Sequence, residues 1–109
     1  MNWKIITEEN QIEEIREQSN ERPQIIFKHS TRCNISTMAK SRLERANAPE
    51  GLVFYYLDLI RYRTISNMLA VEFSVHHQSP QVLLIRNGAC VYDESHNGIS
   101  MEELIEQAA

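Results

Sequence analysis

The chain has 109 residues, a length that suits one domain able to bury a core without disulfides or metals. It carries 11 basic and 15 acidic side chains, a net charge of −4, and no basic stripe along any predicted helix, which argues against a nucleic-acid partner. No segment approaches the ~20 apolar residues that span a membrane, and the start of the chain lacks a signal-peptide pattern. We therefore expect one cytoplasmic domain over residues 1–109, a monomer or weak dimer without a membrane partner.

The first half of the chain is predicted to run strand, helix, strand, helix. Residues 3–6 form a short strand candidate, and Thr7 is a candidate cap for a helix with apolar positions on one face. The run QIIFKH at 24–29 is typical of a buried strand. After Cys33, apolar residues recur at helical spacing, and the stretch NAPEG at 47–51 ends that helix.

The second half adds three strands and two helices. The run LVFYYLDL at 52–59 predicts the third strand, and apolar residues at helical spacing between 65 and 73 predict the third helix. A loop then leads to the strand QVLLI at 81–85. The pair Asn87-Gly88 is a strong two-residue hairpin signal, so the last two strands are expected to be antiparallel. An amphipathic helix over 101–108 closes the chain.

The resulting order, β-α-β-α-β-α-β-β-α, predicts an α/β fold with a central mixed sheet flanked by four helices. Helices that alternate with the first three strands indicate right-handed crossovers, and the hairpin adds an antiparallel edge. This is the thioredoxin-like layout, which hosts many functions, so the function has to be argued from the site. Tyr55 and Tyr56 are assigned to opposite faces of the sheet, and Trp3 and the methionines to the core.

Cys33 is expected at the turn from the second strand into the second helix. A cysteine at the first turn of a helix meets free backbone N–H groups and the positive end of the helix dipole, and both stabilise a thiolate. Arg32 adds positive charge beside the sulfur, although such an arginine is more often simply solvated. Ser36 stands where a Cys-x-x-Cys protein has its resolving cysteine, and its hydroxyl either donates to sulfur or bonds the backbone. Together with Asn34, these two residues are the candidate thiolate-stabilising groups.

The stretches FKHSTRCNIS, SPQVLLIRNG and CVYDESHNGIS together resemble the YtxJ-like monothiol bacilliredoxins, a thioredoxin-fold family, over essentially the whole chain. The family motif Thr-Cys-Pro-Ile-Ser reads Arg-Cys-Asn-Ile-Ser at 32–36, so two neighbours of the cysteine differ. The resemblance implies an oxidoreductase that removes bacillithiol, or a similar small thiol, from mixed disulfides on proteins through Cys33. The small thiol would be a co-substrate, S-thiolated proteins the partners, and no cofactor would be tightly bound.

Ser79 and Pro80 are predicted to form the second half of the site. In thioredoxin-like folds, the residue before the strand that opens the final hairpin is typically a cis-proline beside the active cysteine. About one X-Pro bond in twenty is cis, and the alternative is a proline that simply starts a strand. A cis bond here would let Ser79 present its backbone N–H and C=O groups to an extended substrate. His29, at the end of the second strand, is a further substrate-binding candidate.

Cys90, in the last strand, is expected to be a packed thiol, because a resolving role needs its Cα within about 7 Å of the Cα of Cys33. The histidines at 76, 77 and 96 lack metal-ligand spacing to a cysteine pair, so no metal site is expected. Two function classes stay open, a thiol-disulfide oxidoreductase and a redox-inert thioredoxin-like binding module acting as a stress or assembly factor. Cys33 at the helix start favours the oxidoreductase, because a pure binding module needs no thiol there.

Overall fold

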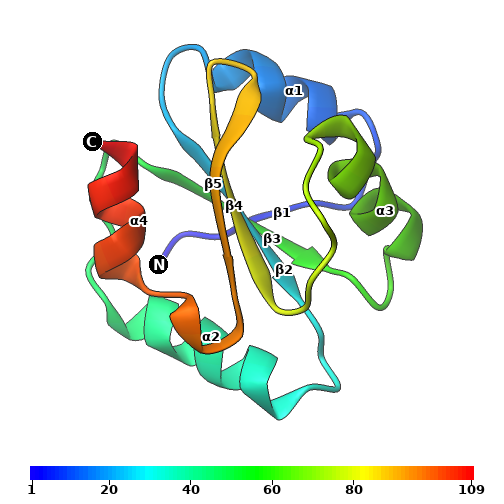
Figure 1. Cartoon of the computed structure of the whole chain (residues 1–109), viewed down its shortest axis with the longest axis vertical. Coiled ribbons are helices and arrows are strands. Elements are labelled where there is room, and N and C mark those ends of the chain that lie inside the picture. The colour runs from blue at the N-terminus through cyan, green and yellow to red at the C-terminus, as the bar shows by residue number, and fades with distance from the viewer.

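The computed structural model describes residues 1–109, and the predicted order of strands and helices is confirmed. The elements are β1 (Lys4–Ile5), α1 (Gln11–Gln18), β2 (Gln24–His29), α2 (Asn34–Arg45), β3 (Val53–Asp58), α3 (Arg63–Glu72), β4 (Gln81–Arg86), β5 (Ala89–Ser95), the 3-10 turn η1 (His96–Gly98) and α4 (Met101–Ala108). The strands form one mixed sheet in the order β1-β3-β2-β4-β5 (Figure 1). β1 and β2 both pair with β3 in parallel, whereas the β2–β4 and β4–β5 pairs are antiparallel.

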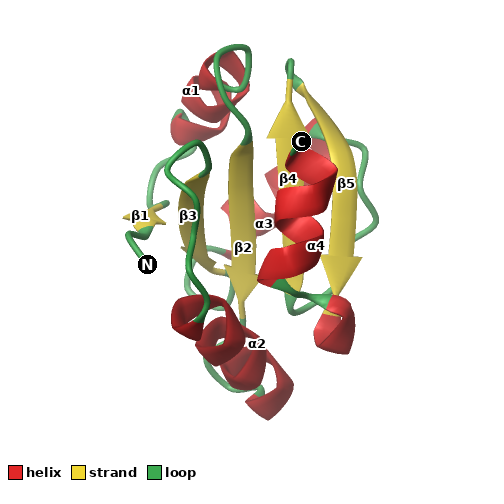
Figure 2. Cartoon of the chain, turned by 90° about the vertical axis from the view of Figure 1, so that its left-hand side faces the viewer, coloured by secondary structure: helices red, strands yellow, loops and turns green.

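Helices cover both faces of the sheet, and Figure 2 shows α4 in front of the strands with α3 behind them. One core lies between the sheet and α1 with α3, and the other between the sheet and α2 with α4. Ile26 belongs to the first core and Phe27 to the second, because successive side chains of a strand point to opposite faces. Tyr55 and Tyr56 likewise pack on opposite faces, as predicted.

Every residue of β2 is buried, because this strand lies between β3 and β4 and is covered on both faces. Such a position explains its near-continuous apolar run. It also buries the two polar residues at its end, Lys28 and His29, which are 1% and 5% exposed. Buried polar groups need hydrogen-bond partners, so these two side chains connect the end of β2 to the residues that they bond.

Two expectations about the helices and the core are wrong. Thr7 does not cap α1, because the chain makes a turn first: the Gln11 side chain accepts the N–H groups of Thr7 and Glu8, and the cap position falls at Asn10. The methionines are not all core residues either. Met101 is buried, but Met38 is 60% exposed because it lies on the outer face of α2.

The loops that follow β2 and β3 and the loop that precedes β4 lie at the same edge of the sheet. The C-terminal ends of β2 and β3 and the start of β4 lie at this edge, where α2 also begins (Figure 1). The β4–β5 hairpin turn at Asn87-Gly88 lies at the opposite edge. None of the helices is both long and apolar enough to cross a membrane.

Candidate active site

Cys33 occupies the N-cap position of α2, as predicted. Its backbone is extended, with φ −118° and ψ 120°, and its carbonyl accepts the N–H of Thr37 at 3.0 Å. The thiol is free and partly exposed. The first-turn N–H groups that follow the cap have no helical acceptor, so they and the helix dipole favour negative charge at this position. The sulfur therefore lies at the start of the helix, partly exposed, where a second molecule can reach it.

The neighbours of Cys33 divide into exposed and buried side chains. Arg32 and Asn34 are exposed, and neither side chain forms a hydrogen bond or ion pair within the chain. Both are therefore free to meet an incoming substrate. The main chain itself is held by a bond from the N–H of Cys33 to the carbonyl of Ser30, at 3.2 Å.

The hydroxyl of Ser36 forms hydrogen bonds to other groups than the Cys33 thiol. Ser36 is fully buried, its Oγ accepts the N–H of Ser30 at 2.9 Å, and it lies 2.6 Å from Nδ1 of His29. No hydrogen bond joins it to Sγ of Cys33. The expectation that Ser36 stabilises the thiolate directly is therefore corrected in favour of its alternative, a hydroxyl that bonds the backbone. The bond fixes the turn that presents Cys33.

His29 supports Ser36 from inside the protein. Its ring stacks on Phe27 with a centroid distance of 5.6 Å and contacts Tyr56 at the same distance. Burial, followed by the charge of Lys40, lowers the pKa of His29, so its ring is neutral near pH 7. A ring that is 5% exposed cannot offer a substrate-binding surface. The role predicted for His29 is therefore corrected to one of supporting the start of α2.

Ser79 and Pro80 lie at the same edge of the sheet as Cys33. The register pairs Gln81 with Lys28, which places Pro80 beside the end of β2 from which the chain continues to Cys33. The Ser79–Pro80 bond is cis, and Pro80 is buried. Its carbonyl accepts the N–H of His96 at 3.1 Å, whereas the N–H and C=O of Ser79 have no partner within the chain. The backbone of Ser79 is thus available to a ligand.

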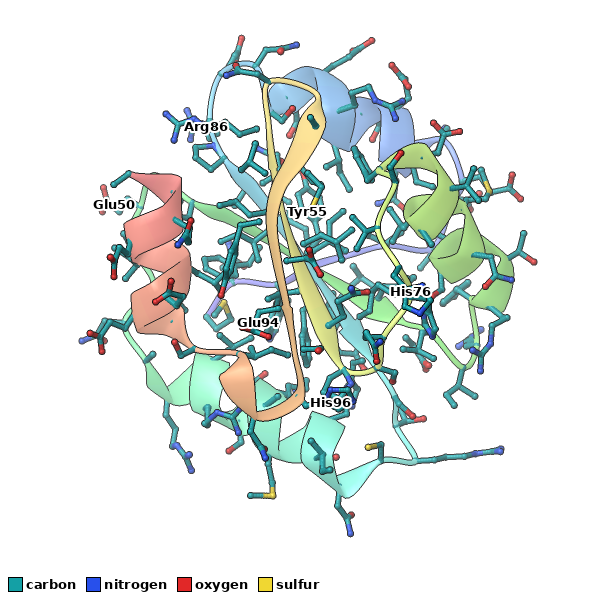
Figure 3. The ribbon with its side chains drawn as sticks, in the orientation of Figure 1. Glu50, Tyr55, His76, Arg86, Glu94 and His96 are labelled. Carbon is teal, nitrogen blue, oxygen red and sulfur yellow. The ribbon has the colours of Figure 1, made fainter.

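The η1 turn is a third segment at this edge, which the sequence pattern does not predict. Figure 3 shows His96 at the end of β5 near which α2 begins. Arg42 of α2 donates to the carbonyls of His96 and Ile99, at 3.2 and 3.1 Å, and so joins the turn to the helix. Only the short sequence stretch HNG hinted at a turn, and no local pattern indicated its contact with α2.

Cys90 lies far from this edge. It pairs with Ile85 of β4, four residues from Gln81, and four residues of strand span roughly 13 Å. That separation exceeds the ~7 Å between Cα atoms that a disulfide allows. Burial raises the pKa of the Cys90 thiol to about 11, and its Sγ donates to the carbonyl of Tyr92. Cys90 is a packed, protonated thiol.

The candidate site does not coincide with the largest hollow of the surface. No cluster of three or more His, Cys, Asp or Glu side chains is arranged to hold a metal ion. The largest hollow, of about 620 Å³, is lined by the N-terminal residues and the segment from Ala46 to Phe54, and contains none of the predicted site residues. Glu50, on its rim, lies far from His96 in Figure 3. The reactive side chain that the structure places at this end of the sheet is the free thiol of Cys33.

Comparisons with known proteins agree with this geometry. The family model described as "Monothiol bacilliredoxin BrxC" matches residues 4–104. A solved structure described as a proposed oxidoreductase with a thioredoxin fold is 26% identical, covers 96% of this chain and 92% of its own, and has a TM-score of 0.80. Thioredoxins from Malassezia sympodialis and Plasmodium falciparum, 15% and 19% identical, each cover 99% of this chain, and 92% and 100% of their own, with TM-scores of 0.74. These two show the fold alone.

Proposed function

Because the chain belongs to the monothiol bacilliredoxin family of thiol-disulfide oxidoreductases, we propose that it removes bacillithiol, or a similar small thiol, from mixed disulfides on proteins. The observation that carries the proposal is the state of its two cysteines. Cys33 is free and partly exposed at the start of α2, Ser36 occupies the resolving position, and Cys90 lies in β5 beside the far end of β4. One thiol can attack a disulfide here, and no second thiol can resolve the product.

The reaction transfers one small thiol at a time. The Cys33 thiolate attacks the sulfur of the small thiol within the mixed disulfide, a new S–S bond forms, and the old S–S bond breaks. The target cysteine leaves as a thiolate and takes a proton from water. A second small-thiol molecule, as thiolate, then attacks the adduct on Cys33. It releases a disulfide of two small thiols and restores the Cys33 thiolate.

Each residue of the site has a proposed role in this exchange. The free N–H groups of the first turn of α2 stabilise the Cys33 thiolate, and the exposed Arg32 and Asn34 face the incoming substrate. The unpaired N–H and C=O of Ser79 bind the extended backbone of a thiolated protein, as in the addition of a strand. The small thiol is a co-substrate and no cofactor is tightly bound. We place the reaction in the cytoplasm, where thiols are kept reduced, with the protein acting as a monomer or weak dimer.

Exposure to an oxidised small thiol tests the proposal. Incubation with oxidised bacillithiol or glutathione should add one small thiol to the wild-type chain, on Cys33, as measured by intact mass and peptide mapping. Cys90→Ser should form the same stable adduct, and Cys33→Ser should form none. Absence of any adduct would instead favour the redox-inert binding module. Loss of the adduct to an internal Cys33–Cys90 disulfide would contradict the monothiol mechanism.

A further inference from the structure

Lys28 is a buried cation at the edge of the sheet that carries the site. It lies in β2, five residues before Cys33, and its side chain is on the face covered by α1 and α3. The residue is 1% exposed, yet no carboxylate lies within ion-pair distance of it. Its ammonium donates instead to Nδ1 of His77 at 2.8 Å and to Oε1 of Gln81 at 3.0 Å. Both partners belong to the segment 76–81, which contains Ser79 and Pro80.

The side chain of Gln81 organises that segment. Its Oε1 also accepts the N–H of Gln78, and its Nε2 donates to the carbonyl of His76 at 3.0 Å and to Asp93 at 3.3 Å. The amide of Gln81 thus holds the chain on the N-terminal side of Ser79, while Gln81 itself follows Pro80. Lys28 is the β2 side chain that bonds to this amide, so it links the strand leading to Cys33 with the segment that presents Ser79.

The charges around Lys28 fit this role. Burial, followed by the charges of Lys28, Arg63 and His76, lowers the pKa of His77, so its ring is neutral near pH 7 and Nδ1 can accept from the ammonium. Burial, with a smaller contribution from Arg63, lowers the pKa of Lys28 to about 8. Removing a buried charge in favour of an apolar side chain of similar size is often neutral or stabilising. Stability alone therefore does not account for a lysine at this position.

We propose that Lys28 is a positioning residue, which holds the segment 76–81 so that the Ser79 backbone is in register with Cys33 for a peptide substrate. The inference rests on the proposed function for its substrate, a thiolated protein or peptide. It goes beyond that function by assigning recognition of the peptide backbone to a side chain on the opposite face of the sheet from Ser36 and His29. Lys28 touches neither the sulfur nor the substrate.

The test compares a disulfide that contains a peptide backbone with one that does not. One is a peptide whose cysteine carries glutathione in a mixed disulfide, and the other is bis(2-hydroxyethyl) disulfide, which has no peptide groups. Formation of the Cys33 adduct is followed in single turnover, by quenching and mass measurement, over a range of disulfide concentrations. The variant is Lys28→Met, which keeps the length of the side chain and loses both hydrogen bonds. The matched control is Tyr55→Phe, which removes a hydrogen bond to Gln18 from the same face of the sheet.

Lys28→Met should raise the half-saturating concentration of the peptide about fivefold to tenfold, the effect of misplacing about one hydrogen bond. The limiting rate with the peptide, and the rate with bis(2-hydroxyethyl) disulfide, should stay within about twofold of wild type. Tyr55→Phe should change neither. If Lys28→Met leaves the half-saturating concentration unchanged, or slows both disulfides alike with loss of stability, the positioning role is wrong.

Deuterium exchange separates this inference from the proposed function, because it needs no substrate. The segment 76–81 should exchange faster in Lys28→Met than in wild type. The N–H of Gln78 donates to Oε1 of Gln81, and the variant no longer holds that oxygen in place. If the wild type forms no adduct with either disulfide, the proposed function fails, and unchanged exchange in 76–81 would overturn the positioning role as well. Should Lys28→Met not fold, His77→Ala removes one of the two bonds and should show smaller changes in the same direction.

Discussion

A single buried hydroxyl, that of Ser36, decides how Cys33 is presented. In a dithiol protein the side chain at this position reacts with the adduct, but here it bonds the N–H of Ser30 and the ring of His29. The turn from β2 into α2 is thereby fixed from inside, and the thiol remains the only reactive group at the start of the helix. The two cysteines also differ in their surroundings. Cys33 is partly exposed at a helix start, and Cys90 is packed in β5.

Ser36→Ala should destabilise the fold without removing the reactivity of Cys33. The buried N–H of Ser30 would lose its acceptor, and an unsatisfied buried donor costs about 1–3 kcal/mol. The free energy of unfolding in urea measures this loss. The rate of Cys33 alkylation by iodoacetamide should change by less than about threefold, which corresponds to about 0.65 kcal/mol of barrier. A loss of alkylation rate by a factor of a hundred would show that the hydroxyl acts on the sulfur after all.

Cys90 should resist alkylation that modifies Cys33. Burial raises the pKa of Cys90 to about 11, so at pH 8 it is almost entirely a thiol, and the thiolate is the nucleophile. Iodoacetamide at pH 8, followed by peptide mapping, should label Cys33 alone in the folded protein. In urea both cysteines should be labelled. Equal labelling of the two in the folded state would contradict the packing of Cys90.

At the scale of elements, three segments make the candidate site: the start of α2, the segment 76–81 and the η1 turn. The last two are attached to the sheet or to α2 by side chains that are distant in sequence. Lys28 bonds to His77, 49 residues away, and Arg42 bonds to Ile99, 57 residues away. The site is therefore rigid where long-range contacts hold the backbone, and open at Arg32 and Asn34, whose side chains have no partner.

Arg42→Ala should loosen the η1 turn. The guanidinium donates to the carbonyl of His96 in the turn and to that of Ile99 directly after it. Hydrogen bonds to a charged group contribute about 1.5–3 kcal/mol each when buried. Because Arg42 is only half-buried, we expect a total loss near 1–2 kcal/mol in the free energy of unfolding. Deuterium exchange should speed up at 96–99 and remain unchanged in β2. Arg42→Lys, which keeps the charge, should recover part of the loss.

For the whole molecule, the cost of burying Lys28 links stability to pH. The pKa of Lys28 is lowered in the folded state, so below about pH 8 folding carries a buried charge that the unfolded chain solvates. As pH rises above this value, the folded protein releases the proton before the unfolded chain does. Stability from this group therefore increases with pH up to the ordinary lysine value of 10.5. The groups that face Lys28 are His77, Arg63 of α3 and, through Gln81, Asp93 of β5.

Lys28→Met should be more stable than wild type at pH 7, by roughly 1–3 kcal/mol. Each unit by which the pKa of Lys28 is lowered corresponds to a cost of about 1.4 kcal/mol for the buried charge, which the variant avoids. The loss of two hydrogen bonds offsets part of this gain. The difference should shrink as pH rises from about 8 to 10.5, where the wild type recovers its own loss. Urea unfolding of both proteins at several pH values between about 8 and 10.5 measures the difference directly, and groups that do not interact with Lys28 contribute equally to both proteins. A gain that is constant over this range would show that Lys28 does not titrate as described.

The sequence by itself determined the order of elements, the position of Cys33 at a helix start and the hairpin at Asn87-Gly88. These features depend on local periodicity and turn chemistry, which act over a few residues. Only the tertiary structure decided that Ser36 bonds to His29, that Lys28 meets His77 and Gln81, and that Arg42 holds the η1 turn. These partners are set by strand register and by the packing of helices on the sheet, so no local pattern encodes them.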